Sequence, residues 1–304
     1  MKIHAILNRA GGTLKTTDLE MLRRLICDEF AMHGHEIEVE LVEGGDVGVA
    51  IEKAAEREDL DVLLVGGGDG TVSCAAAALM DGTIALAILP AGTMNLFARS
   101  LQIPLALDQA VSALAGGRVI AVDIATVNGS PFVHQFAVGL HARMVRTRER
   151  LDYGSRIGKM WATTRAIAAT VRSLPMVRLE IEVDGHKETI ASPAVAVSNN
   201  LYGEGHLPFA DDPQGGQLGV YICRTDDSLA MAKLALDMLR GAWRGNKALT
   251  IVSAKRVRID YEGGKKKDRA VRDGELVDLD AISDIEIHEK ALRVLVPQEA
   301  TLAG

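Results

Sequence analysis

Three short glycine-rich segments carry residues suited to phosphate binding. They are Asn8 to Gly12, Gly66 to Thr71 and Pro90 to Asn95. Glycine lets the backbone approach a ligand closely, and backbone N–H groups in such turns bind phosphate oxygens. Phosphoryl transfer needs mainly positioning and charge neutralisation, which these segments could supply. The positions that we expect to contact a nucleotide are Asn8, Gly11, Gly12, Gly67, Gly68, Asp69, Gly70, Thr71, Gly92, Thr93 and Asn95.

Each segment follows an apolar run that reads as a buried strand. Residues 2 to 8 lead into the first segment, Val62 to Val65 into the second and Ile84 to Leu89 into the third. Val72 to Met80 has the pattern of a helix, so its free N–H groups would point back at the second turn. Neighbouring strand-turn-helix units place their turns at one edge of a parallel sheet. We therefore expect a single cleft lined by these turns.

The order of the apolar runs predicts two kinds of sheet. Strand and helix patterns alternate over about the first 100 residues, which is typical of a parallel α/β domain. Helices are expected after Thr17 and Glu20, which have capping-box spacing, and over Leu107 to Ala115. Later runs are short and separated by Asn-Gly, Asp-Gly and Gly-Gly turns, which are typical of antiparallel hairpins. These runs are Ile120 to Val127, Phe132 to Val138, Val177 to Val183, Ala194 to Val197, Leu218 to Cys223, Leu249 to Ile259, Ala270 to Val277 and Ile285 to Ile287.

We therefore predict an α/β fold with two domains. Residues 1–122 would form the nucleotide-binding α/β domain, with residues 291–304 returning to it. Residues 123–290 would form a β-rich substrate domain.

Composition and missing motifs exclude several classes of protein. The formal net charge of −7 argues against a nucleic-acid partner. The sequence has no Gly-x-x-x-x-Gly-Lys-Ser/Thr loop and no Gly-x-Gly-x-x-Gly after the first strand, which disfavours P-loop enzymes and ordinary dehydrogenases. Three scattered cysteines and the lack of a long apolar stretch predict a cytoplasmic location.

Two amphipathic patterns interrupt the second domain, and each allows two interpretations. One is Lys159 to Leu174. The other is Ser228 to Arg244, where apolar residues are flanked by basic ones: Leu229, Leu236, Leu239 and Trp243 beside Lys233, Arg240 and Arg244. Either pattern could be a helix that covers a sheet. The alternative is peripheral contact with an anionic membrane at its inner face, to which Lys265 to Lys267 could add.

The three segments, in this order, resemble the catalytic domain of soluble diacylglycerol kinases and related lipid kinases, including sphingosine kinases. The likeness extends to Val138-Gly139-Leu140, Ser198-Asn199-Asn200 and Asp273-Gly274-Glu275, and so covers nearly the whole chain. The turn from Gly67 to Thr71 is shared with NAD kinases. The segment from Gly92 to Arg99 is more specific to the lipid kinases.

The resemblance implies transfer of the γ-phosphoryl group of ATP, with Mg²⁺, to a lipid hydroxyl, such as diacylglycerol giving phosphatidic acid or a related glycerolipid. It offers two candidates for the general base. Asp273 matches the base proposed for bacterial diacylglycerol kinases, and Asp69 matches the one assigned in sphingosine and NAD kinases. We favour Asp273 as the base, Asp69 as the residue that handles phosphate-bound magnesium, and Glu275 as a supporting carboxylate. Without the resemblance, Asp273-Gly274 would read as a plain hairpin turn.

The sequence departs from the family at one metal position. Gly215-Gly216 stands where many relatives have Asp-Gly, and that aspartate helps hold a structural magnesium in some of them. Asp211 and Asp212 lie a few residues earlier and could substitute. Met94 and Leu96-Phe97 also differ from the family and could alter the choice of acceptor.

Two other functions stay open from the sequence. One is a kinase of a soluble substrate, of the NAD kinase type, and the other is a non-catalytic nucleotide-binding regulator. The expected partners are a lipid substrate and a membrane surface. The sequence does not decide between a monomer and a homodimer.

Overall fold

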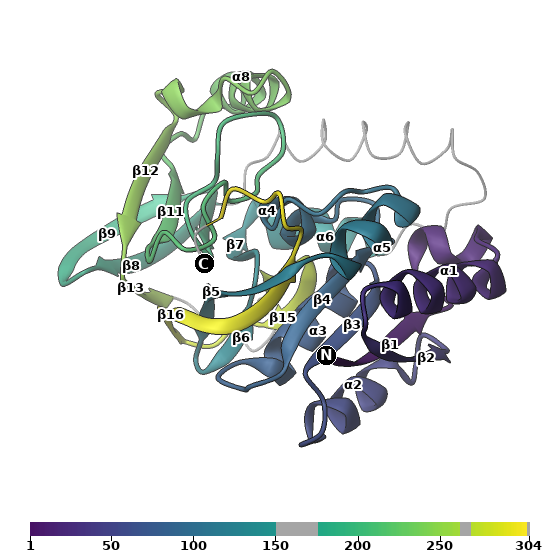
Figure 1. Ribbon diagram of the computed structural model, residues 1–304. Coiled ribbons are helices and arrows are strands. Elements are labelled where there is room, and N and C mark those ends of the chain that lie inside the picture. The colour runs from purple at the N-terminus through teal and green to yellow at the C-terminus, as the bar shows by residue number, and fades with distance from the viewer. Residues whose placement is uncertain (150–175, 262–268, 303–304) are drawn as a thin grey trace.

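The computed structural model describes residues 1–149, 176–261 and 269–302. The N-terminal part alternates strands and helices (Figure 1). Its elements are β1 (Lys2–Asn8), η1 (Gly12–Thr16), α1 (Leu19–Met32), β2 (Glu36–Val42), α2 (Val47–Ala55), β3 (Val62–Gly67), α3 (Asp69–Leu79), β4 (Ala85–Pro90), α4 (Leu96–Ser100) and α5 (Leu107–Ala115).

A parallel sheet forms the centre of this part. Strands β2, β1, β3 and β4 are neighbours in that order, and every pair among them is parallel. All residues of β3 and β4 are buried, as expected for strands covered on both faces. Helix α1 contacts α5, and α2 contacts α3. The predicted parallel α/β domain is therefore confirmed.

The rest of the described chain is mostly strand. Its elements are β5 (Arg118–Val127), β6 (Ser130–Phe132), β7 (Gln135–Gly139), α6 (Leu140–Glu149), β8 (Val177–Val183), β9 (His186–Ser192), β10 (Ala194–Ser198), β11 (Leu218–Cys223), α8 (Ser228–Leu239), η2 (Trp243–Gly245), β12 (Leu249–Ala254), β13 (Arg256–Tyr261), β14 (Arg269–Arg272), β15 (Glu275–Asp278) and β16 (Ile282–Val296). Strands β12, β11, β10, β7, β14 and β15 form a second, antiparallel sheet. The predicted antiparallel β-rich part is also confirmed.

The long strand β16 belongs to both parts of the molecule. Its first half pairs antiparallel with β13, and near its end Val294 pairs parallel with Leu86 of β4. Figure 1 shows this yellow strand crossing from the C-terminal strands toward β4. The sheet therefore continues from β2 to β9, and the exact boundary at 122/123 stays a prediction.

Some predicted elements have different limits, for physical reasons. The run from Phe132 to Val138 is broken after Phe132, because the N–H groups at 133–135 bind the Asp273 carboxylate. The run from Leu249 to Ile259 is two strands that belong to different sheets. Helix α1 is capped by Asp18, whose carboxylate accepts from the N–H groups of Glu20 and Met21, so the capping box at Thr17 is wrong.

Strand β9 was not predicted, because its polar sequence exposes most of its side chains at the edge of the sheet. Among the described residues, no helix is long and apolar enough to cross a membrane. The predicted helix over Lys159 to Leu174 and the lysine run at 265–267 lie outside the described residues.

Candidate active site

The three glycine turns meet at one edge of the parallel sheet. A Cβ built on Gly11 would lie 3.4 Å from the Cα atom of Gly67, and one on Gly68 would lie 3.5 Å from the Cα of Gly92. At Gly12 a Cβ would come within 2.1 Å of the Ala91 carbonyl oxygen, so only glycine fits there. The expectation that the turns line one place agrees with these distances, although their contact with a nucleotide stays a prediction.

Polar side chains fix the first and second turns to each other. Asn8 donates from Nδ2 to the Thr71 hydroxyl at 3.3 Å, and its Oδ1 accepts from the N–H of Ala10 at 2.9 Å. A Cβ on Gly67 would clash with Thr71 at 2.6 Å. Asn8 and Thr71 therefore shape the turns, and the backbone is left to face a ligand.

Asp69 joins the second turn to the third. It begins α3, and its two carboxylate oxygens accept from the N–H groups of Asn95, at 3.1 Å, and Leu96, at 2.8 Å. Asn95 adopts a left-handed conformation (φ 51°) and exchanges two hydrogen bonds with the backbone of Gly92. Thr93 is exposed at the tip of this turn. Asp69, at the start of α3, thus holds the third glycine turn in place.

Asp273 is buried where the β-rich part meets α3. Its carboxylate accepts from the Ser73 hydroxyl at 2.5 Å and from three successive backbone N–H groups, Val133 at 2.9 Å, His134 at 2.8 Å and Gln135 at 3.0 Å. Burial raises the pKa of Asp273, and these four hydrogen bonds oppose the rise. With φ 48° at Asp273 and 85° at Gly274, the segment is also a hairpin turn between β14 and β15.

Glu275 extends the same contact toward the glycine turns. Its Oε1 lies 3.0 Å from the position of a Cβ on Gly70, in the first turn of α3. Gly70, Ser73, Asp273 and Glu275 together line a cavity of about 440 Å³. The three predicted catalytic carboxylates are therefore all tied to α3 or to its immediate surroundings.

The residues around the glycine turns can supply one carboxylate ligand to magnesium, and they do not form a metal site of several side chains. Among the described residues, no group of three His, Cys, Asp or Glu side chains could hold a metal ion. Mg²⁺ commonly takes one or two carboxylates plus substrate phosphates, and Asp69 offers one carboxylate beside the turns. Because each Asp69 oxygen accepts only one hydrogen bond, each retains a lone pair for a metal.

The structure offers no support for the alternative metal ligands Asp211 and Asp212. The Asp212 carboxylate accepts from the N–H of Gln214 at 2.9 Å, which is a local turn. Asp211 packs against Gly203, where a Cβ would fall 2.0 Å from its carboxylate. Nearby, the buried Asp123 carboxylate accepts from three direct donors, the side-chain amide of Asn200 at 2.8 Å and the N–H groups of Gly216 and Lys290 at 2.7 and 2.9 Å. The loop that carries Gly215-Gly216 is therefore fastened by hydrogen bonds.

An apolar pocket of about 420 Å³ opens in the β-rich part. Its polar floor consists of Gln135, His141 and Tyr202, and the Tyr202 hydroxyl donates to Gln135 Oε1 at 2.9 Å. The N–H of Gln135 donates to Asp273, so Gln135 connects the floor of the pocket directly to the candidate base. Among the described residues, no charged side chain lines this pocket. The other lining residues are Leu140, Met144, Ala194, Ala196, Pro208, Tyr221, Cys223, Met231, Leu234, Ala235, Met238, Trp243 and Leu249.

The sequence did not single out the polar floor or its neighbour His134. The His134 ring packs against Tyr202 at a tilt of 34°, with ring centroids 5.3 Å apart, and the backbone N–H of His134 binds Asp273. Burial lowers the pKa of His134 to about 4, although the Asp69 carboxylate opposes this, and burial also lowers the pKa of His141. Both rings are therefore neutral near pH 7. Isolated histidines and a glutamine inside a strand pattern give no signal in the sequence that could have identified them.

The low pKa of His134 predicts acid sensitivity of the fold. Between its ordinary value of 6.5 and about 4, the unfolded chain binds a proton that the folded chain excludes. The free energy of unfolding should therefore fall as the pH is lowered through this window, by about 1 kcal/mol or more from this group, and recover fully above it. Urea denaturation across the window, for wild type and His134→Gln, measures the effect. Equal pH slopes for the two proteins would contradict the assignment.

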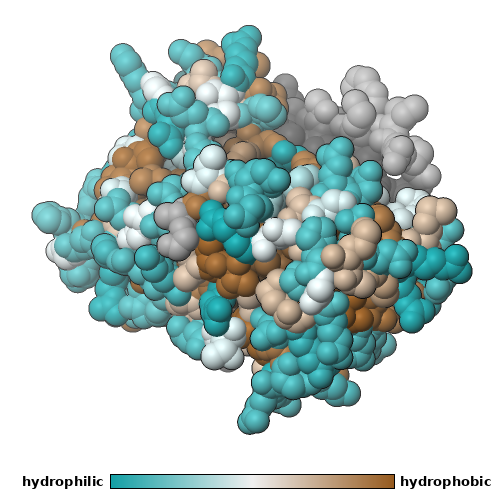
Figure 2. All heavy atoms as spheres, in the orientation of Figure 1, coloured by the Kyte–Doolittle hydropathy of each residue, from teal (hydrophilic) through white to brown (hydrophobic). Residues whose placement is uncertain are grey.

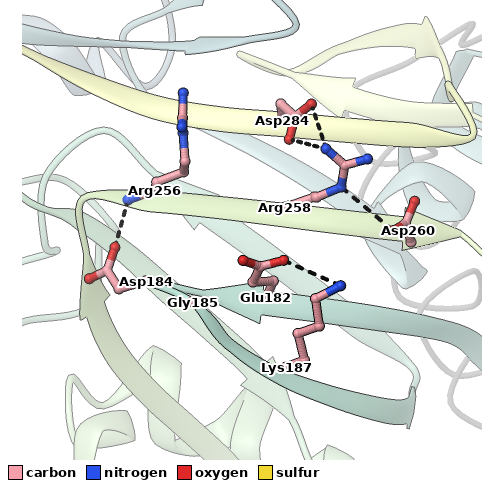
Figure 3. Close-up of a pocket in the computed structure, with 8 residues that line it drawn as sticks. All are labelled: Glu182, Asp184, Gly185, Lys187, Arg256, Arg258, Asp260 and Asp284. Carbon is pink, nitrogen blue, oxygen red and sulfur yellow. Dashed lines mark hydrogen bonds and ion pairs between the residues drawn. The ribbon is translucent and has the colours of Figure 1, made fainter.

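A second concave surface, also about 420 Å³, is charged and lies at the far edge of the mixed sheet. Figure 3 shows its residues on β8, β9, β13, β16 and the turn between β8 and β9, with dashed lines joining oppositely charged side chains of Lys187 and Glu182 and of Arg258 with Asp260 and Asp284. Arg258 lies 3.2 Å from Asp284 and 3.6 Å from Asp260, and Lys187 lies 3.6 Å from Glu182. Such exposed ion pairs are typical of a solvated strand surface. This surface is remote from the glycine turns in the fold and carries none of the candidate chemistry.

Comparison with known proteins agrees with this fold. Residues 2–127 match the family model described as the diacylglycerol kinase catalytic domain. Residues 136–296 match the YegS C-terminal NAD kinase beta sandwich-like domain. The two matches define the class of protein as a kinase built from two parts. The chain belongs to the diacylglycerol kinase family of the YegS type.

Individual relatives are similar over only part of their length. An uncharacterised protein of Synechocystis sp. is 29% identical over 206 residues, which cover 64% of this chain and 46% of that protein. A Yersinia pestis protein named "Probable lipid kinase YegS-like" is 40% identical over 101 residues, 32% of this chain and 34% of the relative. The aligned parts thus span less than half of these relatives.

Solved structures support the fold over the whole chain. A Bacillus anthracis structure described as a diacylglycerol kinase is 20% identical, with a TM-score of 0.70 over 99% of this chain and 98% of that one. Another structure from the same organism reaches a TM-score of 0.76 at 22% identity, over 99% and 98% of the two chains. At these identities the likeness concerns the fold alone.

Proposed function

We propose that this protein is an ATP- and Mg²⁺-dependent lipid kinase that phosphorylates a hydroxyl group of diacylglycerol or a related glycerolipid. The observation that carries the proposal is the position of Asp273. Its carboxylate is bonded to α3, the helix that begins at the glycine turns, and to Gln135 in the floor of the uncharged pocket. A phosphoryl donor on one side and an apolar acceptor on the other would meet at this residue.

The chain's own groups divide the work as follows. Backbone N–H groups of the three turns would bind the phosphate oxygens of ATP, and Asp69 holds two of these turns together. Bound Mg²⁺ would neutralise phosphate charge, with Asp69 as its protein ligand. The acceptor oxygen would attack the γ-phosphorus, ADP would leave, and Asp273 would receive the hydroxyl proton.

Ser73 marks where the acceptor hydroxyl would bind. In the structure its hydroxyl donates to Asp273 Oδ2 at 2.5 Å, and Ser73 lines the cavity beside α3. The three backbone donors on Asp273 belong to a rigid segment, whereas a serine hydroxyl rotates easily. An incoming hydroxyl could therefore replace Ser73 on Oδ2 and leave the other hydrogen bonds intact.

The apolar pocket would hold the acyl chains. Its walls are apolar or neutral. A lipid tail that enters the pocket would leave water for apolar surroundings, which is energetically favourable. ATP and Mg²⁺ are supplied in the cytoplasm, and we place the enzyme there, at the inner face of the membrane that holds its acceptor.

A panel of acceptors tests the proposal. Purified protein with labelled ATP and Mg²⁺ should transfer label to diacylglycerol in mixed micelles, and Ala196→Trp, which fills the pocket, should lower kcat/KM for the lipid about tenfold by loss of apolar burial. ATP affinity should not change, because Ala196 is on β10, away from the glycine turns. Transfer to NAD without lipid, or no transfer to any lipid hydroxyl, would refute the proposal.

A further inference from the structure

Helix α8 exposes apolar side chains on its outer side. Leu229 and Leu239 are each 77% exposed, and Leu236 is 43% exposed. Trp243, which the sequence placed on the same face, is instead buried at 5% exposure, and its Nε1 donates to the Gly205 carbonyl at 2.8 Å. The helix ends at Leu239, so Trp243 follows in η2 and turns inward.

The inner side of α8 is apolar as well. Met231 and Leu234 are buried and line the apolar pocket. A helix that only covers a sheet normally has a polar outer face. Residues at 229, 236 and 239 recur at the spacing of a second face, and Figure 2 shows apolar and hydrophilic atoms side by side at the end of the molecule that α8 forms. The packing of the described residues therefore does not account for the outer leucines.

Basic residues surround this outer face. From Asp226 to Lys247 the basic side chains are Lys233, Arg240, Arg244 and Lys247, and the acidic ones are Asp226, Asp227 and Asp237. Asp227 caps the N-terminus of α8, and Arg244 donates to the Tyr202 carbonyl, so Lys233 and Arg240 are the charged residues beside the outer leucines. Asp237 accepts from the Asn246 side chain at 2.7 Å. The pair of basic side chains beside the outer leucines stands in a chain with a formal net charge of −7. The surface thus complements an anionic partner that also accepts apolar side chains.

We infer that this docking face, formed by Leu229, Leu236 and Leu239 with Lys233 and Arg240, binds the surface of an anionic lipid bilayer. The inference rests on the proposed function, since it supplies the acceptor from that bilayer. Leucines would enter the boundary between headgroups and acyl chains, and the basic side chains would contact anionic headgroups.

Docking through α8 would also place the acyl pocket at the membrane. Met238 on α8 and Met144 on α6 both line the pocket and are each 42% exposed, so they form part of its rim. A lipid could then move from the bilayer along α8 into the pocket, with its headgroup directed to the Gln135 floor.

Flotation of the full chain with vesicles tests the inference. Wild type should float with phosphatidylcholine vesicles that contain phosphatidylglycerol and should float poorly with pure phosphatidylcholine. The double variant Leu229→Ser with Leu239→Ser should lower the partition coefficient about tenfold or more. Lys233→Glu with Arg240→Glu should have an effect of similar size that disappears at high salt.

Matched controls come from α1, far from α8 in the fold. Met21 is 69% exposed and Arg23 is also exposed, so Met21→Ser with Arg23→Glu makes comparable apolar-to-polar and basic-to-acidic changes on another helix. This double variant should leave flotation unchanged. Brominated lipid should quench the tryptophan fluorescence of Leu229→Trp more than that of wild type, and Met21→Trp should show no such increase. This measurement keeps a test available if the serine variants fold poorly.

The outcomes separate this inference from the proposed function. Docking variants should keep wild-type activity on a short-chain acceptor dissolved in detergent, and should lose it on vesicles. Unchanged flotation of both double variants would overturn the inference while leaving kinase activity in place. Conversion of a dimer to a monomer by Leu229→Ser with Leu239→Ser, without loss of flotation, would assign the face to self-association instead.

Discussion

Asp273→Asn is expected to lower kcat by about a thousandfold, because general-base catalysis by a positioned carboxylate contributes factors of about 10² to 10⁴. The Kd for ATP should change by less than about threefold, since no glycine turn is altered. Single-turnover transfer and equilibrium nucleotide binding measure the two quantities separately. Loss of ATP binding with the turnover rate per bound ATP preserved would mean that Asp273 has no role as a base.

Stability must be measured on the same variant. Asp273 accepts from three backbone N–H groups, and an asparagine amide directed at them would leave donors facing donors. Ser73→Ala is the matched control, because it removes one donor from the same carboxylate and leaves the base in place. It should retain activity within about tenfold of wild type. A Ser73→Ala loss as large as that of Asp273→Asn would identify the hydrogen-bonded pair as a structural unit.

Gly68→Ala is expected to weaken ATP binding about a hundredfold without unfolding the protein. Gly68 has φ −89° and ψ −177°, which alanine adopts freely, and the nearest atom to the added Cβ is the Gly92 Cα at 3.5 Å, an ordinary contact. The methyl group would fill the space between the second and third turns. Loss of about two charge-assisted hydrogen bonds to phosphate corresponds to this factor.

Calorimetric titration with an ATP analogue and Mg²⁺, together with thermal unfolding, checks this result. Gly45→Ala is the control, because a Cβ at Gly45 meets nothing within 4 Å and Gly45 lies outside the three turns. It should leave both the affinity and the midpoint of unfolding unchanged. Wild-type affinity in Gly68→Ala would show that the space between the turns is not where phosphate binds.

The sequence predicted the parts of the fold that depend on local pattern. Continuous apolar runs at Val62 to Val65 and Ile84 to Leu89 identified the buried strands, and the glycines after them identified the turns. That these turns meet could be predicted as well, because parallel strands share an edge. The residue types of Asp273-Gly274 suit a hairpin turn, and both residues adopt positive φ, so the run predicted from Ala270 to Val277 is divided into β14 and β15.

Other features depend on contacts between distant segments and had no local signal. The sequence could not show that the Asp273 carboxylate binds the backbone at 133–135, nor that this contact breaks the strand pattern there. It placed Trp243 on the same helix face as Leu229, Leu236 and Leu239, whereas the helix ends at Leu239 and the chain buries the indole against Tyr221. The polar floor of the pocket likewise exists only because β7 and Tyr202 are brought together by the fold.

Hydrogen exchange of backbone amides tests the central claim most directly, namely that the three turns together bind the triphosphate. With a non-hydrolysable ATP analogue and Mg²⁺, amides at 10–13, 67–71 and 91–95 should all become protected, and those of β9 should not. Protection of a single turn, or of a surface elsewhere with these segments unchanged, would contradict a shared phosphate site.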